Sequence, residues 1–510
     1  MNLFLRRNAP VFYMLLAMIV LYAPWMGRGY VNLEYPFSMA ARGLSDSRFA
    51  DQVDSYLGMQ ANPLGYSFVL AAIYKIFGYH DWFWLAKLPS LCGALMIIVS
   101  GWMLTRDRWQ DRRSLFYFWS SLVILNPLFV AFATSSTADV LHIGLLMMAI
   151  AIAMAYRNES WIRPFIASII FGIAVITKFI PIYFGFAFIA IAVLDKSKLQ
   201  RTPKHICRDI ALYVLVPGAI LIFYIWWLYA KYSVFISYGL GPGKPNFFDV
   251  AKFLVTFSKY LAFLGLCCGP ISLLIILKSF RDIKKIVFGF LFVPVAIVSG
   301  AYVSTIQVDE MDFGGGFPFG LGILRGIQTI GFVIGLSVIA VFLKSITSSD
   351  RLQGVLLSGI APSLVLISLT LPTQRYIMIV VPAVLILLID ASNPLSVKLR
   401  NLTLAVTALG FALVSLLGMS YLRAQGNASE NMAVWMKNNG LIAQSSASPI
   451  GVHAGQHFYG LVQSEVKYDV IATSLEGEKL IKERILHCEP MNVLGRITRV
   501  YVLRELPKTP

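Results

Sequence analysis

The chain has 510 residues, of which 57% are hydrophobic and only 14% are charged. A soluble domain carries about 25% charged residues, so this composition excludes an ordinary soluble protein, which would expose large apolar patches to water. The formal charge of +17 would suit a nucleic-acid binder. However, the Lys and Arg residues cluster between apolar segments, where the positive-inside rule places them in membrane proteins. The composition therefore predicts a multi-spanning membrane protein without a nucleic-acid partner.

Apolar stretches long enough to cross a hydrocarbon core of about 30 Å recur along the chain. The clearest lie at residues 11–26, 85–104, 211–230 and 403–421. The first of these ends in bulky residues and lacks a small-x-small cleavage site, so we interpret it as a retained span and not as a cleaved signal peptide.

Basic residues orient these spans. Arg6 and Arg7 place the N-terminus in the cytoplasm, and the first outer loop then covers residues 27–84. Within that loop, residues 63–77 are predicted to form a helix along the outer membrane surface, because a crossing there would place the basic cluster 106–113 outside. With this choice every later basic cluster faces the cytoplasm.

The predicted topology has about thirteen spans, because the short helices 164–177 and 180–194 must form a pair with an outer bend. The remaining residues differ in character and indicate a small mixed α/β domain on the outer face. The predicted fold is thus an all-α polytopic membrane domain at residues 1–421 and an extracytoplasmic domain at residues 422–510. Within the latter we expect helices at 429–439 and 475–485 and strands at 449–452 and 497–503.

Ionisable residues near the hydrocarbon are costly and mark candidate functional sites. The topology places four such groups at the outer face, namely Glu34, Asp139, Lys178, and Arg375 with Tyr376. The acidic loop that contains Asp309 and Glu310 is a fifth candidate on the same face. Each has a simpler explanation. Glu34 would be a solvated loop acid, Asp139 a helix cap, and the two cations interfacial anchors. Their occurrence together at one membrane face favours a functional role.

These residue types suit one kind of chemistry. Arg binds phosphate in a bidentate fork and Lys binds it as a point charge, which suits a phosphate at a membrane surface. A carboxylate takes the proton from an attacking hydroxyl group. Transfer of a sugar from a lipid-linked phosphate to a hydroxyl acceptor needs both functions.

An ordered set of motifs over residues 10–195, with a weaker continuation at 372–390, carries a family resemblance. It comprises Glu34 after the first span, Asn62-Pro-Leu-Gly-Tyr66 running to Phe77-Gly78, Thr137-Ala-Asp139, a Gly-rich helix ending in Thr177-Lys178, and Arg375-Tyr376 followed by Pro382. With these motifs the chain resembles the GT-C membrane glycosyltransferases, especially the protein O-mannosyltransferases and the bacterial aminoarabinose transferases.

The resemblance implies many spans, an outward-facing active site, and transfer of a hexose or pentose from a polyprenyl-phosphate donor to a lipid, glycan or protein acceptor. Glu34 would be the general base, and Asp139 would orient the acceptor or hold a divalent metal, although no metal is required by the sequence. Lys178, Arg375 and Tyr376 would bind the donor phosphate. Asn62, Tyr66, Asp309 and Glu310 are the expected substrate-binding residues.

The sequence departs from the family pattern at two positions. The usual Asp-Glu pair is reduced to Glu34, which follows Leu33, and the usual Lys or His before the proline is Asn62. These departures leave the base, the donor sugar and activity itself open. Two alternatives therefore remain: a lipid or polysaccharide transporter, and a catalytically inactive GT-C-like assembly subunit.

Overall fold

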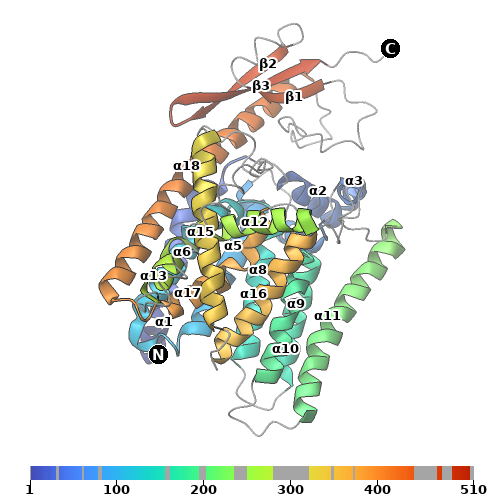
Figure 1. Ribbon diagram of the computed structural model, residues 1–510. Helices are drawn as coiled ribbons and strands as arrows, with labels where there is room; N and C mark the ends of the chain where they lie inside the picture. Colours follow the sequence, from blue (N-terminus) through green and yellow to red (C-terminus); the bar gives the residue numbers. More distant parts are fainter. Residues whose placement is uncertain are drawn as a thin grey trace. The chain divides into compact units, whose positions relative to one another are not determined.

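The computed structural model describes residues 2–29, 34–59, 62–78, 83–155, 161–194, 203–234, 250–279, 321–345, 350–370, 374–440, 468–473 and 485–505. These residues are mainly helical and end in a small sheet (Figure 1). They form two compact units. Unit 1 comprises Met1–Met18, Cys92–Phe129 and Asp139–Leu413, and unit 2 comprises Ile19–Leu91, Val130–Ala138 and Val414–Pro510.

The helices and strands follow one another in this order: α1 Asn2–Met26, α2 Glu34–Ser45, η1 Ser47–Phe49, α3 Asp51–Met59, α4 Gly65–Phe77, α5 Phe83–Thr105, η2 Gln110–Arg112, α6 Arg113–Ile124, α7 Pro127–Ala133, α8 Ala138–Met154, α9 Ile162–Thr177, η3 Ile180–Phe184, α10 Gly185–Leu194, α11 Pro203–Tyr232, α12 Val250–Cys268, α13 Ile271–Ser279, α15 Leu321–Ser345, α16 Arg351–Thr370, η5 Gln374–Ile379, α17 Val381–Ala391, α18 Val397–Asn438, β1 Tyr468–Thr473, β2 Ile485–Val493 and β3 Arg496–Glu505.

Among the described residues, six helices are long and apolar enough to cross a membrane, and the count rises to eight if each of two sharply bent helix pairs is one span. The outward-facing side chains of these helices are apolar; on α11, for example, Leu215 and Ile222 are exposed. Such a surface would be unstable in water and suits a lipid environment. The chain is therefore a predominantly helical protein with several apolar spans, and the expected number of about thirteen stays a prediction.

Glycines allow two close helix crossings in unit 1. Helices α12 and α15 pack against each other where they cross (Figure 1), and a Cβ atom added to Gly335 would lie 2.0 Å from the carbonyl oxygen of Leu261. Helices α5 and α8 cross in the same way, because a Cβ atom at Gly144 would meet the carbonyl oxygen of Gly93 at 2.2 Å. Small residues let backbones approach where lipid gives no hydrophobic driving force. The second crossing fixes the position of α8, whose first turn contains Asp139.

Helix α17 lies at the centre of unit 1. Ten of its residues are buried, which is typical of a core helix that is apolar on all sides. It packs against α6, α12, α13, α15 and α16. The indole nitrogen of Trp119 donates to the carbonyl oxygen of Pro382 at 3.0 Å and so fixes the start of the helix. Because η5 leads directly into this helix, Arg375 and Tyr376 are held against the core of the unit.

In unit 2, α2 packs against α3 and α4. The rings of Tyr56 and Tyr66 both contact Phe37, at centroid distances of 5.6 and 5.2 Å. Helix α4 confirms the helix expected at residues 63–77. Its 13 residues span about 20 Å at a rise of 1.5 Å each, which is shorter than a bilayer core. Its place along the membrane surface stays a prediction.

The C-terminal sheet has the order β1-β3-β2, and both pairings are antiparallel. Strands β2 and β3 are joined by a two-residue turn, Leu494-Gly495, in which both residues have positive φ angles of 50° and 81°. Such a turn matches the twist of the flanking strands. The ring of Trp435, near the end of α18, stacks on His487 of β2 at 4.3 Å. This contact ties the sheet to the last turns of the helix.

The strands and helices expected from the sequence for residues 422–510 are confirmed in part. The strand expected at 497–503 is confirmed by β3, and the helix at 429–439 is the end of α18, which continues without a break from the last apolar stretch. The expected strand at 449–452 lies outside the described residues. The expected helix at 475–485 also lies outside them except for its last residue, Ile485, which is the first residue of β2. The domain boundary at residue 422 stays a prediction.

Candidate functional site

Two largely buried clusters, one in each unit, contain five of the sequence-predicted site residues. The first, which we call the Asp139 cluster, consists of Asp139, His142, Lys178, Arg375 and Tyr376 and lies in unit 1. The second, the Arg28 cluster, consists of Arg28, Glu34, Lys87, Thr134 and Ser135 and lies in unit 2.

An ion pair forms the centre of the Asp139 cluster. The ammonium group of Lys178 donates to Oδ1 of Asp139, and only 4% and 8% of the two side chains are exposed. Asp139 lies in the first turn of α8, where a carboxylate interacts favourably with the helix dipole. Lys178 is the C-terminal cap of α9, and its extended backbone directs the chain away from the helix. Two helix ends thus supply opposite charges to one buried point.

Two cations share the ring of Tyr376. The ammonium of Lys178 lies 4.6 Å from the ring centroid, and the guanidinium carbon of Arg375 lies 5.4 Å from it. Both distances fall within the range of cation–π attraction. Arg375 also interacts electrostatically with Asp139. The structure therefore brings together four predicted residues from three segments that are far apart in the sequence.

His142 is a member of this cluster that sequence reasoning missed. It lies one turn after Asp139 on α8, is 2% exposed, and interacts electrostatically with the Asp139 carboxylate. Its spacing from Asp139 could have indicated this, because residues three apart on a helix lie on the same face.

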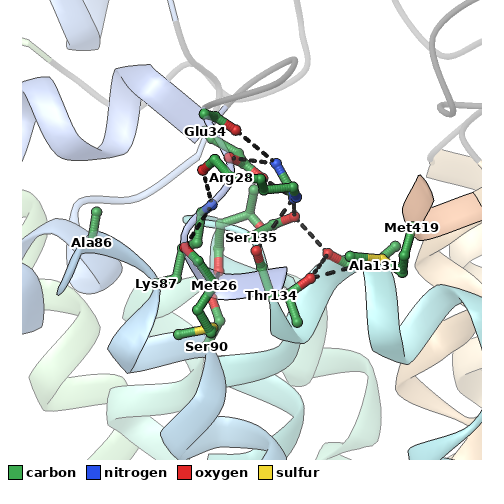
Figure 2. Close-up of polar contacts among 12 residues, drawn as sticks. Met26, Arg28, Glu34, Ala86, Lys87, Ser90, Ala131, Thr134, Ser135 and Met419 are labelled. Carbon is green, nitrogen blue, oxygen red and sulfur yellow. Dashed lines mark hydrogen bonds and ion pairs between the residues drawn. The ribbon is translucent and has the colours of Figure 1, made fainter. Parts of the chain in front are cut away.

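In the Arg28 cluster, the guanidinium group of Arg28 binds both oxygens of Glu34 (Figure 2). The Nη2–Oε1 distance is 2.5 Å and the Nη1–Oε2 distance is 3.2 Å. Nη2 also donates to Oγ of Ser135 at 2.6 Å and to the carbonyl oxygen of Thr134 at 3.3 Å. With side-chain exposures of 0% for Arg28 and 2% for Glu34, this is a fully desolvated pair. Arg28 thereby joins the end of α1, the start of α2 and the turn between α7 and α8.

Lys87 fixes the backbone beneath this pair. Its ammonium group donates to the carbonyl oxygens of Arg28 at 2.6 Å and Met26 at 3.2 Å, and its side chain is fully buried in α5 (Figure 2). Close packing holds the same backbone from another side, since a Cβ atom at Gly29 would lie 2.5 Å from the carbonyl oxygen of Gly426 in α18. The end of α1 is thus held by hydrogen bonds and by backbone contact together.

Sequence reasoning missed both basic members of this cluster. Lys87 falls inside the apolar stretch 85–104 and was hidden by its neighbours, while Arg28 resembles an ordinary basic residue that flanks a span. The informative signal for Lys87 was a lysine within an apolar segment, which is costly unless it has partners.

The four predicted substrate-binding residues, Asn62, Tyr66, Asp309 and Glu310, are not members of either cluster. The hydroxyl of Tyr66 donates to the carbonyl oxygen of Ala86 at 2.8 Å and pairs with Ser90 at 3.2 Å, as a satisfied core tyrosine does. The backbone oxygen of Asn62 accepts from Tyr56 at 3.3 Å. Asp309 and Glu310 lie outside the described residues.

Within the described part of the chain, no group of three or more His, Cys, Asp or Glu side chains is arranged to hold a metal ion. Each cluster contains one ion pair, Lys178 with Asp139 in the first and Arg28 with Glu34 in the second. Each cluster therefore holds a carboxylate and a cation in direct contact.

Comparisons with known proteins give only structural matches. No family model and no curated protein matches the sequence. Among solved structures, the chain is similar to ArnT from Cupriavidus metallidurans bound to undecaprenyl phosphate, with 15% identity, 99% coverage of each chain and a TM-score of 0.45. It is also similar to the archaeal oligosaccharyltransferase AglB from Archaeoglobus fulgidus, with 12% identity, a TM-score of 0.41, and coverage of 85% of this chain and 58% of AglB.

Proposed function

We propose that the protein is a GT-C-type membrane glycosyltransferase that moves a sugar from a polyprenyl-phosphate donor to a hydroxyl acceptor at the outer face of the cytoplasmic membrane. The observation that carries the proposal is the meeting of Lys178 and Arg375 on the ring of Tyr376. Two cations held together in a poorly screened site suit a phosphate leaving group, whose charge is expensive to leave isolated beside hydrocarbon.

In the proposed reaction the acceptor oxygen attacks the anomeric carbon as the bond from that carbon to the phosphate oxygen breaks. Lys178 and Arg375 stabilise the departing polyprenyl phosphate, a role in which preorganised cations contribute several kcal/mol. Lys178 is paired with Asp139 at rest. Its transfer to the phosphate leaves Asp139 available to orient the acceptor or to hold a divalent cation. Glu34 takes the proton of the acceptor hydroxyl and later releases it to water.

One observation favours the inactive assembly subunit as the second candidate. Both oxygens of Glu34 accept hydrogen bonds from Arg28, within a fully buried pair. Both carboxylate oxygens are thus already engaged before an acceptor hydroxyl group arrives. An inactive relative would keep the pair for its structural value and would bind a lipid phosphate without turning it over.

The test uses the full chain in lipid vesicles with a panel of undecaprenyl-phosphate pentoses and hexoses, and with a lipid, a glycan and a protein as alternative acceptors. Release of undecaprenyl phosphate is measured. We expect turnover with one sugar class and, for Glu34→Gln, a decrease of about 10²–10⁴-fold at unchanged donor binding. Binding without release would support the inactive subunit, and transbilayer movement of an intact donor would support a transporter.

A further inference from the structure

We propose that Arg112, Lys278 and Arg400 form a binding site for a phosphate group at the turn between α17 and α18. The three residues belong to unit 1, and the site shares no residue with either cluster described above. Its basis is the convergence of three basic side chains, from segments far apart in the sequence, on a turn that offers them neutral acceptors. The inference goes beyond the proposed glycosyl transfer and does not depend on it.

The three cations meet at the dipeptide Asn393-Pro394. Arg112, the last residue of η2, donates from Nη1 to the side-chain amide oxygen of Asn393 at 2.7 Å. Arg400, in the first turn of α18, donates from Nη1 to the same oxygen at 3.4 Å. Lys278, in the last turn of α13, donates to the carbonyl oxygen of Pro394. Amide oxygens carry only partial negative charge, so these contacts do not neutralise the three cations.

Within the part of the chain that the structure describes, no carboxylate pairs with these cations. Asp390, at the end of α17, pairs with Arg108 instead, at 2.5 Å. Arginine does not lose its charge in proteins, and Arg112 and Arg400 also interact electrostatically with each other. Two like charges that share one neutral acceptor repel each other. An anion bound between them would turn this repulsion into attraction.

The start of α18 adds positive potential at the same place. The first turn of the helix contains no acidic residue, and the N-terminal end of a helix carries partial positive charge. Arg400 lies in this turn although it is only 4% exposed. A buried cation is costly unless an opposite charge accompanies it. Phosphate suits this need, because it accepts two hydrogen bonds from a guanidinium fork and also pairs with an ammonium group. The exposed side chains of Arg112 and Lys278 leave the site open to a ligand.

The surroundings favour a lipid headgroup over a free phosphate ion as the source of this group. The positive-inside rule predicts that these basic segments face the cytoplasm, where anionic lipids are enriched in the membrane surface. Helix α18 exposes an apolar stripe that begins in the same turn as Arg400 and comprises Leu399, Leu402, Val406 and Leu409. An acyl chain can lie along this stripe while the phosphate of its headgroup reaches the three cations.

Thermal unfolding of the full chain in a neutral detergent tests the site without a sugar donor. We expect phosphatidylglycerol to raise the unfolding midpoint of the wild-type protein by about 2–5 °C and zwitterionic phosphatidylcholine to leave it unchanged. Arg112→Gln, Lys278→Gln and Arg400→Gln should each lose most of this increase. The matched control is Arg163→Gln, which removes one exposed arginine that donates to the carbonyl oxygen of Ala155. This control should keep the wild-type response.

Inorganic phosphate, compared with potassium chloride at equal ionic strength, distinguishes the two sources. Stabilisation by phosphatidylglycerol alone would assign the site to a lipid headgroup, and stabilisation by inorganic phosphate that the variants lose would assign it to free phosphate. No stabilisation of the wild-type protein by either would overturn the proposal. So would an equal loss in Arg163→Gln, because the lipid would then respond only to overall charge. If Arg400→Gln does not fold, the variants of the exposed Arg112 and Lys278 decide the question.

Discussion

Lys178 and Arg375 contact one aromatic ring, that of Tyr376, although one caps α9 and the other lies in η5. Like charges do not gather in a buried site without compensation. Asp139 supplies one negative charge through its ion pair with Lys178, and the face of the ring supplies partial negative charge to both cations. In the proposed reaction, the donor phosphate would bind to these two cations.

The first prediction concerns this balance. Lys178→Ala and Arg375→Ala should each weaken the binding of undecaprenyl phosphate by about 10-fold, or about 1.4 kcal/mol. The double variant should lose less than the sum of the two, because the cations share one ligand and one ring. Affinity is measured by native mass spectrometry in detergent. The control is Lys231→Ala, which removes an exposed lysine that lies 5.6 Å from the ring of Trp227. Unchanged affinity in both single variants would assign the two cations to the interfacial anchors instead.

A second prediction concerns the crossing of α12 and α15. Gly335→Ala should lower the free energy of unfolding by about 1–3 kcal/mol, because the added methyl group would lie 2.0 Å from the Leu261 carbonyl oxygen and force the helices apart. Gly326→Ala on the same helix meets no atom within 4 Å and should be neutral. Thermal unfolding in detergent compares the two. Equal midpoints would show that the helices adjust without cost.

A third prediction concerns the ion pairs of Arg108, which binds Asp350 and Asp390 at 2.5 Å each. Asp390 is 1% exposed and also accepts from the indole of Trp109 at 2.7 Å. Arg108→Ala removes the partner of a buried carboxylate and should destabilise the protein by about 1.5–3 kcal/mol. Combining it with Asp390→Asn should restore part of the loss. Additive losses in unfolding experiments would argue against the pairing.

The same contact predicts a pH dependence. Burial alone would raise the pKa of Asp350, but hydrogen bonds from the Gln353 N–H group and Arg108 outweigh it and hold the pKa below its usual range. The folded state is then stabilised at pH values above the ordinary pKa of about 4 and loses this contribution as the pH falls through the lowered pKa. Thermal unfolding midpoints of wild-type protein and Asp350→Asn should therefore converge in acid. A constant difference at all pH values would contradict this assignment.

The orientation of the chain is tested by thiol labelling in intact cells. In a variant that retains one cysteine at a time, Ile497→Cys in the hairpin should react with an impermeant maleimide added from outside. Cys207 at the start of α11 should not react, because it belongs to a basic segment that the positive-inside rule places in the cytoplasm. Ile497 is half exposed and Cys207 is exposed, so the reagent can reach both positions from solvent. A difference in labelling therefore reports on which side of the membrane each residue lies. The reverse pattern would invert the topology.

Sequence reasoning succeeded where a residue was conspicuous against its neighbours. Asp139, Lys178 and Arg375 interrupt apolar stretches at their ends, so their cost was visible, and the structure brings the three together. It failed for Lys87, because no local pattern reveals that its partners are two carbonyl oxygens at the end of α1. The contact of Gly335 with Leu261 was equally hidden, since backbone proximity depends on which helices become neighbours.

Strand β2 shows a different limit. Its sequence carries Glu489 and Pro490 and lacks regular alternation, and the strand has register irregularities near both ends. It is stabilised by pairing with β3 and by the stacking of His487 on Trp435, both of which are tertiary contacts. Strand β3 was predictable because it is rich in branched and aromatic residues, with Val500, Tyr501 and Val502 in a row.

The partners of Arg28 have a consequence for biosynthesis. Arg28 and Glu34 leave the ribosome early, whereas Lys87 follows 59 residues after Arg28 and Ser135 follows it by 107. While the first helix enters the bilayer, the arginine and the glutamate have only each other and water. Their burial must wait until α5 and the turn before α8 have been synthesised. The nascent chain thus carries a hydrated charge pair at the end of its first helix through the translation of α2 to α7, and this pair is enclosed only when the last partner emerges.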